Sequence, residues 1–250
     1  MKRFINQVAI ITGGADGLGK GIALQIASEG CQVILFDRNL DLLNSTVNEF
    51  RAAGLLVGGY VVDVSVESEI ADALQNVESI FGKIDILVHA AGIVGPTNTK
   101  IADYNTDDFD QVYRVNLRGS FLMTKYVVRI MEKANYGRIL LIASIAGKDG
   151  NPGMVGYSST KAGVIGLVKG VGKEYAESGI TVNGLAPAVI RTAMNEQTDP
   201  VQLEYMTSKI PMKRLGTVQE VAEISSWIIS PQASFTTGFT FDLSGGRATY

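Results

Sequence analysis

The sequence predicts an α/β fold, a single-domain doubly wound parallel sheet of about seven strands with helices on both faces. Short apolar runs rich in β-branched residues alternate with longer amphipathic stretches along all 250 residues, which is the pattern of strands covered on both sides by helices. No internal repeat, low-complexity segment or long linker interrupts this alternation. One domain spanning residues 1–250 is therefore expected.

Each element follows from its local pattern. Apolar runs predict strands at residues 7–12, 32–37, 56–62, 84–89, 137–143, 180–185 and 240–243. Helical spacing of apolar residues predicts helices at residues 18–29, 40–53, 66–81, 107–133, 157–178 and 219–229. Right-handed crossover connections between these parallel strands then place helices on both faces of the sheet. The least patterned stretch, residues 191–215, contains Pro200 and Pro211 and is a candidate lid over a site.

Composition narrows the functional classes. The formal net charge of -3 argues against a general nucleic-acid or membrane-surface binder. The one cysteine, Cys31, forms no intrachain disulfide, and no secretory signal is visible, so a cytoplasmic protein is expected. No apolar run approaches the roughly 18 residues of a membrane span. One histidine and one cysteine make no metal cluster, and no metal is predicted.

A glycine-rich loop, T-G-G-A-D-G-L-G, follows the first predicted strand and opens a helix. Gly13 permits a sharp turn, Gly17 lets the backbone approach a pyrophosphate, and Gly19 allows close packing of the helix. The N–H groups at the start of the helix then face the phosphates. The alternative is a plain turn. The context favours a Rossmann-type dinucleotide site formed by the loop residues Gly13, Asp16, Gly17, Leu18 and Gly19.

Two acidic residues end the second and third predicted strands. The Asp37 carboxylate can accept hydrogen bonds from both ribose hydroxyls and would repel a 2′-phosphate, which favours NAD over NADP. Arg38 next to it weakens this preference, since an arginine there could pair with a phosphate. Asp63 could reach the adenine amino group. The alternatives are a helix N-cap for Asp37 and a turn residue for Asp63.

A serine, a tyrosine and a lysine form a candidate catalytic set. Tyr157 and Lys161 are four residues apart on one helix and so share a face. A phenol has a pKa of about 10, and a nearby ammonium in a partly dry site, with a positive nicotinamide ring, would lower it. Ser144 ends a strand at the carboxyl edge, where such sheets bind ligands. The alternatives are a surface Tyr–Lys pair and a helix cap.

The whole chain resembles the short-chain dehydrogenases/reductases, in the branch of about 250 residues. The motifs that carry the resemblance are Thr12–Gly19, Asp63–Val64, Ala90–Gly92, Asn116, Ser144, Tyr157–Lys161 and Pro187–Thr192. The resemblance implies that Tyr157 is the acid/base, that Lys161 binds the nicotinamide ribose and lowers the pKa of the tyrosine, and that Ser144 orients the substrate. It implies that Asn116 holds a water in a proton relay.

The resemblance also extends the cofactor site. It adds the segments that follow three strands, with the residues Asp63, Val64, His89, Ala90, Gly92, Pro187, Ile190 and Thr192. The family usually has glycine after the proline, where this chain has Ala188, which is expected to stiffen the loop. His89, the only histidine, and Ala90 stand where the family usually carries two asparagines. The side chain of His89 is therefore expected at the adenosine edge of the cofactor site or in a structural role, far from the hydride.

These residues predict reversible oxidation of a secondary alcohol to a ketone with NAD. The chain resembles the sugar-acid dehydrogenases of the family, including those acting on 2-keto-3-deoxy sugar acids. Members of the family are often homotetramers, so the resemblance implies a homotetramer. Lys148, Arg191 and Arg247 are candidates for a substrate carboxylate; the alternative is solvated or interface arginines. A 3-oxoacyl-carrier-protein reductase is a second possibility, which Asp37 disfavours. A non-catalytic NAD-binding scaffold is the third, which the intact Asn, Ser, Tyr and Lys set disfavours.

Overall fold

The computed structural model describes residues 2–192, 200–248 and 250, and it confirms the predicted fold class. A seven-stranded parallel sheet has the order β3-β2-β1-β4-β5-β6-β9. Its strands are β1 (Val8–Thr12), β2 (Gln32–Asp37), β3 (Val57–Val61), β4 (Ile86–His89), β5 (Gly137–Ile142), β6 (Ile180–Pro187) and β9 (Thr240–Leu243). The order reverses beside β1, so the glycine loop that follows β1 lies at the switch point, where ligands of such sheets bind.

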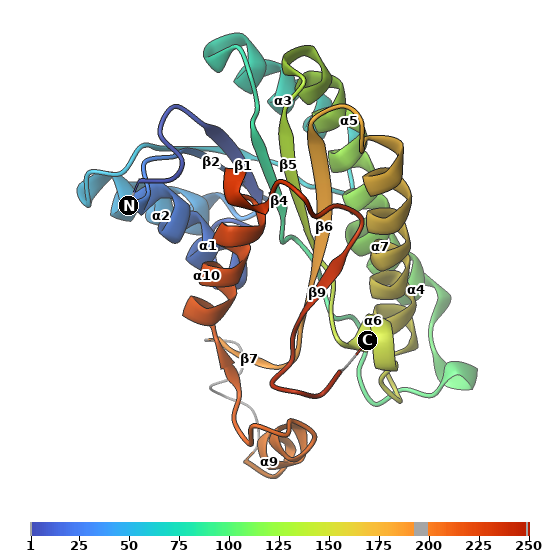
Figure 1. The fold of residues 1–250 in the computed structure, drawn as a ribbon. Helices are drawn as coiled ribbons and strands as arrows, with labels where there is room; N and C mark the ends of the chain where they lie inside the picture. Colours follow the sequence, from blue (N-terminus) through green and yellow to red (C-terminus); the bar gives the residue numbers. More distant parts are fainter. Residues whose placement is uncertain (1, 193–199, 249) are drawn as a thin grey trace.

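Helices cover both faces of the sheet (Figure 1). One layer holds α1 (Gly17–Ser28), α2 (Leu40–Ala52) and α10 (Val218–Ile228). The other holds α3 (Glu67–Phe81), α4 (Thr106–Tyr113), α5 (Gly119–Ala134) and α7 (Val155–Glu174). The four-residue helix α6 (Ala146–Asp149) joins β5 to α7 and lies near the end of the chain (Figure 1).

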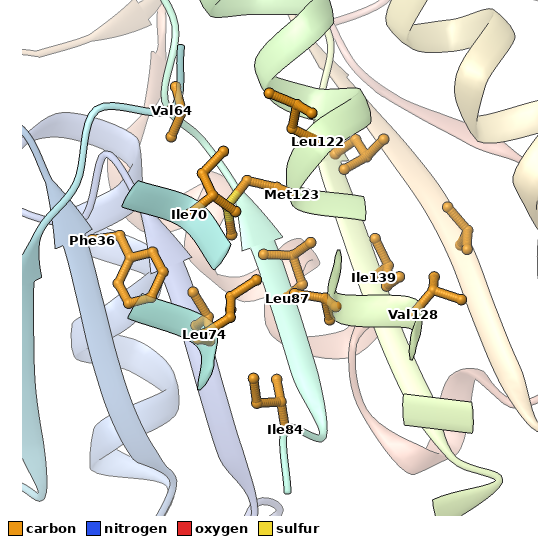
Figure 2. Close-up of a cluster of buried hydrophobic side chains, with 14 of the residues drawn as sticks. Phe36, Val64, Ile70, Leu74, Ile84, Leu87, Leu122, Met123, Val128 and Ile139 are labelled. Atoms are coloured by element: carbon orange, nitrogen blue, oxygen red, sulfur yellow. The ribbon is translucent and has the colours of Figure 1, made fainter. Parts of the chain in front are cut away.

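Two apolar cores result from the alternation of side chains along the strands. Ile10 of β1 belongs to the cluster under α3, α5 and α7, and its neighbour Ile11 belongs to the cluster under α1, α2 and α10. Figure 2 shows the first cluster, in which Phe36 and Leu87 of the sheet meet Met123 of α5. Burial on both faces explains why the strands read as continuous apolar runs.

The helix predicted over residues 107–133 is divided in the structure. A π-helical segment, η2 (Arg114–Arg118), separates α4 from α5. It contains Asn116, which is 1% exposed. π-bulges widen a helix by one residue and occur frequently at functional sites. Apolar periodicity did not reveal it, because a single extra residue leaves the spacing on either side helical.

The candidate lid, residues 191–215, is partly ordered into elements that the sequence pattern did not predict. The helix α9 (Pro200–Ser208) lies beyond the carboxyl edge of the sheet (Figure 1). Strands β7 (Ile190–Arg191) and β8 (Gly216–Thr217) form a separate two-stranded sheet at the ends of this segment. Residues 193–199 of the candidate lid lie outside the described residues. No helix in the described ranges is long and apolar enough to cross a membrane.

Candidate active site

The glycine loop makes a tight passage from β1 into α1. Gly13 has a φ of 61°, and a Cβ there would lie 3.0 Å from the backbone of Ala91. A Cβ on Gly19 would lie 2.1 Å from the carbonyl oxygen of Gly13. The Asp16 carboxylate caps α1 by accepting a hydrogen bond from the Gly17 N–H at 2.7 Å. Only glycine therefore fits at position 19, and this cradle suits a phosphate close to the backbone.

Asp37 lies beside this loop and is not a helix cap. Its carboxylate accepts hydrogen bonds from the Ala15 N–H at 3.2 Å and the Asn39 N–H at 3.0 Å. Asn39 is the N-cap of α2, so the alternative assignment of Asp37 as a cap is wrong. The two bonds hold the carboxylate at the end of β2, where it lines a cavity.

Five segments of the chain line that cavity, and they include residues that the sequence had assigned to cofactor binding as well as residues that it had not. Its lining consists of Gly13, Phe36, Asp37, Arg38, Val62, Asp63, Val64, Ala91, Gly92, Ile93 and Val115. Asp63 also accepts a hydrogen bond from the Ser65 N–H at 2.8 Å, so it is a turn residue as well as part of the lining. Position and polarity fit the adenosine half of a dinucleotide.

The tyrosine and lysine meet in the first turns of α7. The Lys161 ammonium is 5.8 Å from the ring centre of Tyr157 and donates a hydrogen bond to the Ile142 carbonyl at 2.7 Å. Tyr157 is partly buried and is hydrogen-bonded to Ser144. The Ser144 hydroxyl also accepts a hydrogen bond from the Ala146 N–H at 3.1 Å. Three candidate catalytic side chains thus converge where β5 ends.

Burial controls the ionisation of this set. It lowers the pKa of Lys161 to about 8. It raises the pKa of Tyr157, and the hydrogen bond with Ser144 opposes this rise. The protein chain alone therefore does not lower the pKa of the Tyr157 phenol, as the sequence had led us to expect. Ionisation of Tyr157 consequently depends on additional positive charge next to the phenol, which is what an oxidised nicotinamide ring carries.

Asn116 ties the loop after β4 to the catalytic helix. Its side chain accepts a hydrogen bond from the Ile93 N–H at 2.8 Å and donates to the Ile93 carbonyl at 2.9 Å. The same amide nitrogen donates to the Thr160 hydroxyl at 3.3 Å. A Cβ on Gly92 would lie 3.2 Å from Asn116 Oδ1 and 3.5 Å from Lys161 Nζ. A side chain at position 92 would therefore crowd the polar atoms of the asparagine and the lysine.

The only histidine of the sequence is buried inside the protein. His89 is 2% exposed, and its Nδ1 is 2.8 Å from the Thr12 hydroxyl. Burial, with the charge of Lys161, lowers the pKa of His89 to about 3. The imidazole is therefore neutral at physiological pH and is not the base. The expected place of His89 at the adenosine edge or in a structural role, far from the hydride, stays a prediction.

Two of the three basic side chains that are candidates for binding a substrate carboxylate already pair with other groups of the chain. Lys148 donates a hydrogen bond to Asp242 at 3.0 Å and another to the Tyr250 carbonyl. Arg247 pairs with Asp149 at 3.1 Å. Arg191 is exposed on β7. A substrate carboxylate at Lys148 or Arg247 would have to compete with these intrachain pairs, so this hypothesis stays a prediction for all three.

The segment after β6 runs beside the candidate catalytic serine. Pro187 ends β6, and its carbonyl accepts a hydrogen bond from the N–H of Ile145, next to Ser144. Ile190 is buried, and Thr192 is partly buried after β7. These positions suit the predicted contact with the nicotinamide end.

Two supporting residues were not found from the sequence. Thr12 holds His89 and accepts a hydrogen bond from the Ala91 N–H at 3.1 Å. Gly147 lets α6 approach α7, since a Cβ there would lie 2.6 Å from the backbone of Lys161. A polar residue ending an apolar strand was the available signal for Thr12. The close contact at Gly147 left no signal in the sequence.

Comparisons with known proteins agree with this geometry. Residues 13–248 match a family model described as enoyl-(acyl carrier protein) reductase. A 2-dehydro-3-deoxy-L-rhamnonate dehydrogenase (NAD(+)) of Sphingomonas sp. is 43% identical, covering 99% of this chain and 98% of the relative. A 3-oxoacyl-(acyl-carrier-protein) reductase of Thermotoga maritima is 37% identical, with 98% of each covered. The crystal structure of NAD+-bound xylitol dehydrogenase has a TM-score of 0.94 at 32% identity, covering 98% of this chain and 100% of that one.

Proposed function

Because the chain belongs to the short-chain dehydrogenase/reductase family, we propose that it oxidises a secondary alcohol of a sugar acid, such as a 2-keto-3-deoxy sugar acid, with NAD. The observation that carries an oxidoreductase assignment is the convergence of Ser144, Tyr157 and Lys161 at the end of β5. The three side chains come from the segment that follows β5 and from α7. A small-molecule substrate suits such a site.

The side chains support a single acid–base step. A bound nicotinamide cofactor supplies the hydride acceptor. Ser144 orients the substrate oxygen, and Tyr157 takes the hydroxyl proton as the carbon–hydrogen bond breaks. Lys161 favours the phenolate by its charge, since burial weakens screening by water. The proton then leaves through Lys161 and a water near Asn116, as the resemblance to the family implies.

The choice of NAD rests on Asp37. Its carboxylate lines the adenosine cavity and is held by two backbone N–H groups, so it has little freedom to move away from a 2′-phosphate. A fixed negative charge at that point repels NADP and accepts hydrogen bonds from the ribose of NAD. The NAD(+)-dependent relative at 43% identity agrees with this choice.

Replacing Asp37 with asparagine is expected to shift preference from NAD toward NADP. The amide keeps one oxygen acceptor for the loop but loses the charge. Charge-assisted hydrogen bonds contribute about 1.5–3 kcal/mol, so kcat/KM with NAD should fall about 10-fold or more while kcat/KM with NADP rises. The exposed Asp41→Asn variant on α2 is the matched control. An unchanged ratio of the two kcat/KM values in Asp37→Asn would contradict the role of Asp37.

The substrate class is tested by a screen of NAD+ reduction over sugar acids, neutral polyols, hydroxysteroids and 3-hydroxyacyl thioesters. We expect kcat/KM to be highest with a 2-keto-3-deoxy sugar acid, because the relative at 43% identity is named for such a substrate. The 37% identical carrier-protein reductase makes 3-oxoacyl reduction the competing function. Activity confined to acyl thioesters with NADPH would favour that function, and turnover of nothing would favour a non-catalytic scaffold.

We further propose that the protein acts as a homotetramer in the cytoplasm, without nucleic-acid or membrane partners. The proposal rests on the family's frequent tetramers and on the single cysteine, Cys31, which is buried and free. Light scattering after size-exclusion chromatography measures the mass, and a monomer of 26.7 kDa would contradict the tetramer.

A further inference from the structure

The C-terminal segment, residues 244–248 and 250, lies against the short helix α6, near which the chain ends (Figure 1). The Arg247 side chain of this segment is only 11% exposed. Its Nε pairs with Asp149 at 3.1 Å, and its Nη2 donates a hydrogen bond to the Asn151 side-chain oxygen at 2.9 Å. One guanidinium therefore holds both the last residue of α6 and the loop that leads from α6 to α7.

Tyr250 makes a second connection between the C-terminal segment and α6. Its hydroxyl donates a hydrogen bond to the Lys148 carbonyl at 2.8 Å, and its own carbonyl accepts one from the Lys148 ammonium. The same ammonium pairs with Asp242 of β9 at 3.0 Å. Two successive residues of α6, Lys148 and Asp149, are thus attached to the end of the chain.

Helix α6 needs such outside support, because a helix of four residues has too few hydrogen bonds of its own to be stable. Its first residue, Ala146, donates its N–H to the Ser144 hydroxyl oxygen at 3.1 Å. The same hydroxyl is hydrogen-bonded to Tyr157. The orientation of α6 therefore determines where one partner of the Ser144 hydroxyl lies.

The loop after α6 leads to the catalytic helix by a second route. The Asn151 N–H donates a hydrogen bond to the Ser158 hydroxyl at 3.0 Å, and Ser158 directly follows Tyr157 in the first turns of α7. Because Arg247 bonds the side chain of Asn151, it is connected to this turn through one intervening residue. The contacts of Arg247 thus reach Ser144 from one side and Tyr157 from the other.

The C-terminal segment is itself fixed at its other side. The Gly245 carbonyl accepts a hydrogen bond from the Met212 N–H at 3.1 Å, shortly after helix α9. Gly245 has a φ of 59°, and a Cβ there would lie 2.6 Å from the Ile210 side chain. The segment therefore spans from the residues after α9 to α6, with contacts at both sides.

We propose that Arg247 is a positioning residue for Ser144 and Tyr157, which it holds in place through Asp149 and Asn151. Arginine suits this role because its planar guanidinium presents several donors in fixed directions, so that one side chain can bind two groups at once. The role differs from that of a ligand for a substrate carboxylate. The catalytic consequence rests on the function proposed above, whereas the order of residues 144–158 does not.

Kinetics separate positioning from substrate binding. In Arg247→Met, kcat should fall about tenfold with every substrate that the wild-type protein turns over, while each KM stays within about twofold, because misplaced reacting groups weaken the transition state more than binding. Arg247→Lys keeps a charge for Asp149 and should give an intermediate kcat. A KM that rises at least about tenfold for sugar acids alone, with unchanged kcat, would overturn the proposal in favour of a substrate ligand.

A double variant tests whether Arg247 acts through α6. Asp149→Asn should lower kcat by less than Arg247→Met does, because the contact of Arg247 with Asn151 remains. The double variant should have the kcat of Arg247→Met alone, since the second substitution removes a pair that is already lost. Losses that multiply independently in the double variant would contradict this route.

Hydrogen exchange of the full-length protein, followed by mass spectrometry, tests the positioning without substrate or cofactor. Peptides covering residues 144–158 should exchange at least about tenfold faster in Arg247→Met than in the wild type, whereas those of α3 should not change. Arg51→Met is the matched control, because Arg51 bonds the Val57 carbonyl at the start of β3, the edge of the sheet opposite the site. If Arg247→Met does not fold, Arg247→Lys takes its place.

Unchanged exchange of residues 144–158 in the folded variant would overturn the proposal, as would equal acceleration over the whole chain. Faster exchange confined to residues 144–158, in a protein that turns over no substrate, would support the positioning role and refute the proposed function. The two proposals therefore fail separately.

Discussion

Replacing Tyr157 with phenylalanine is expected to abolish turnover while leaving cofactor binding nearly intact. The variant loses the hydroxyl that is bonded to Ser144 and keeps the ring that lies 5.8 Å from the Lys161 ammonium. Loss of a general acid/base lowers kcat by about 10²–10⁴-fold, and kcat here should fall at least that far. The pKa of His89, about 3, excludes the imidazole from that role near neutral pH.

The measurement pairs initial rates with a fluorescence titration of NADH. The Kd for NADH should change by less than about threefold, since the phenol contributes little of the total binding energy. Tyr175→Phe is the matched control, because Tyr175 caps the other end of the same helix α7 and should keep full activity. Wild-type kcat in Tyr157→Phe would refute the assignment of the acid/base.

Replacing Gly19 with alanine is expected to damage both stability and cofactor binding. The new Cβ would lie 2.1 Å from the Gly13 carbonyl oxygen, and both partners are backbone, so the loop must move. Overpacking of this kind costs about 1–3 kcal/mol of unfolding free energy. The movement also displaces the N–H groups that face a pyrophosphate, and the Kd for NADH should rise at least about tenfold.

Urea denaturation and an NADH titration measure the two effects on the same samples. Gly170→Ala is the matched control, because Gly170 is exposed on α7 and a Cβ there meets nothing within 4 Å. It should stabilise the protein by about 0.5–1 kcal/mol, since alanine is the better helix residue, and leave the Kd for NADH unchanged. Wild-type stability and affinity in Gly19→Ala would contradict the close approach of the loop.

The strands of the main sheet were predictable from sequence, because burial on both faces demands continuous apolar runs. Strands β2 and β9 match their predicted bounds, and the other strands of the main sheet differ by one or two residues at their ends. Elements that are not continuous apolar runs were not predicted. The two-residue strand β7, the short helix α6 and the π-helical turn at Asn116 depend on contacts with distant segments, and periodicity carries no trace of them.

The candidate site, too, has features that were predictable from the sequence and features that were not. Tyr157 and Lys161 are recognisable because their spacing along one helix is a local property. Their joint position with Ser144 follows from the short connection through α6 that joins the end of β5 to the start of α7. The pairing of Arg247 with Asp149 brings together residues nearly a hundred positions apart. No local pattern foretells such a pair, and the sequence left this arginine as a candidate substrate ligand.

The sequence alone determined the fold class and predicted the glycine loop and the candidate acid/base, because each depends on local spacing or on the apolar runs of the strands. Tertiary structure decided the environment of single side chains. Burial raises the pKa of Tyr157 and lowers that of Lys161. Burial also lowers the pKa of His89 to about 3. Desolvation of these side chains arises only when distant elements pack together, so these pKa shifts are properties of the folded protein.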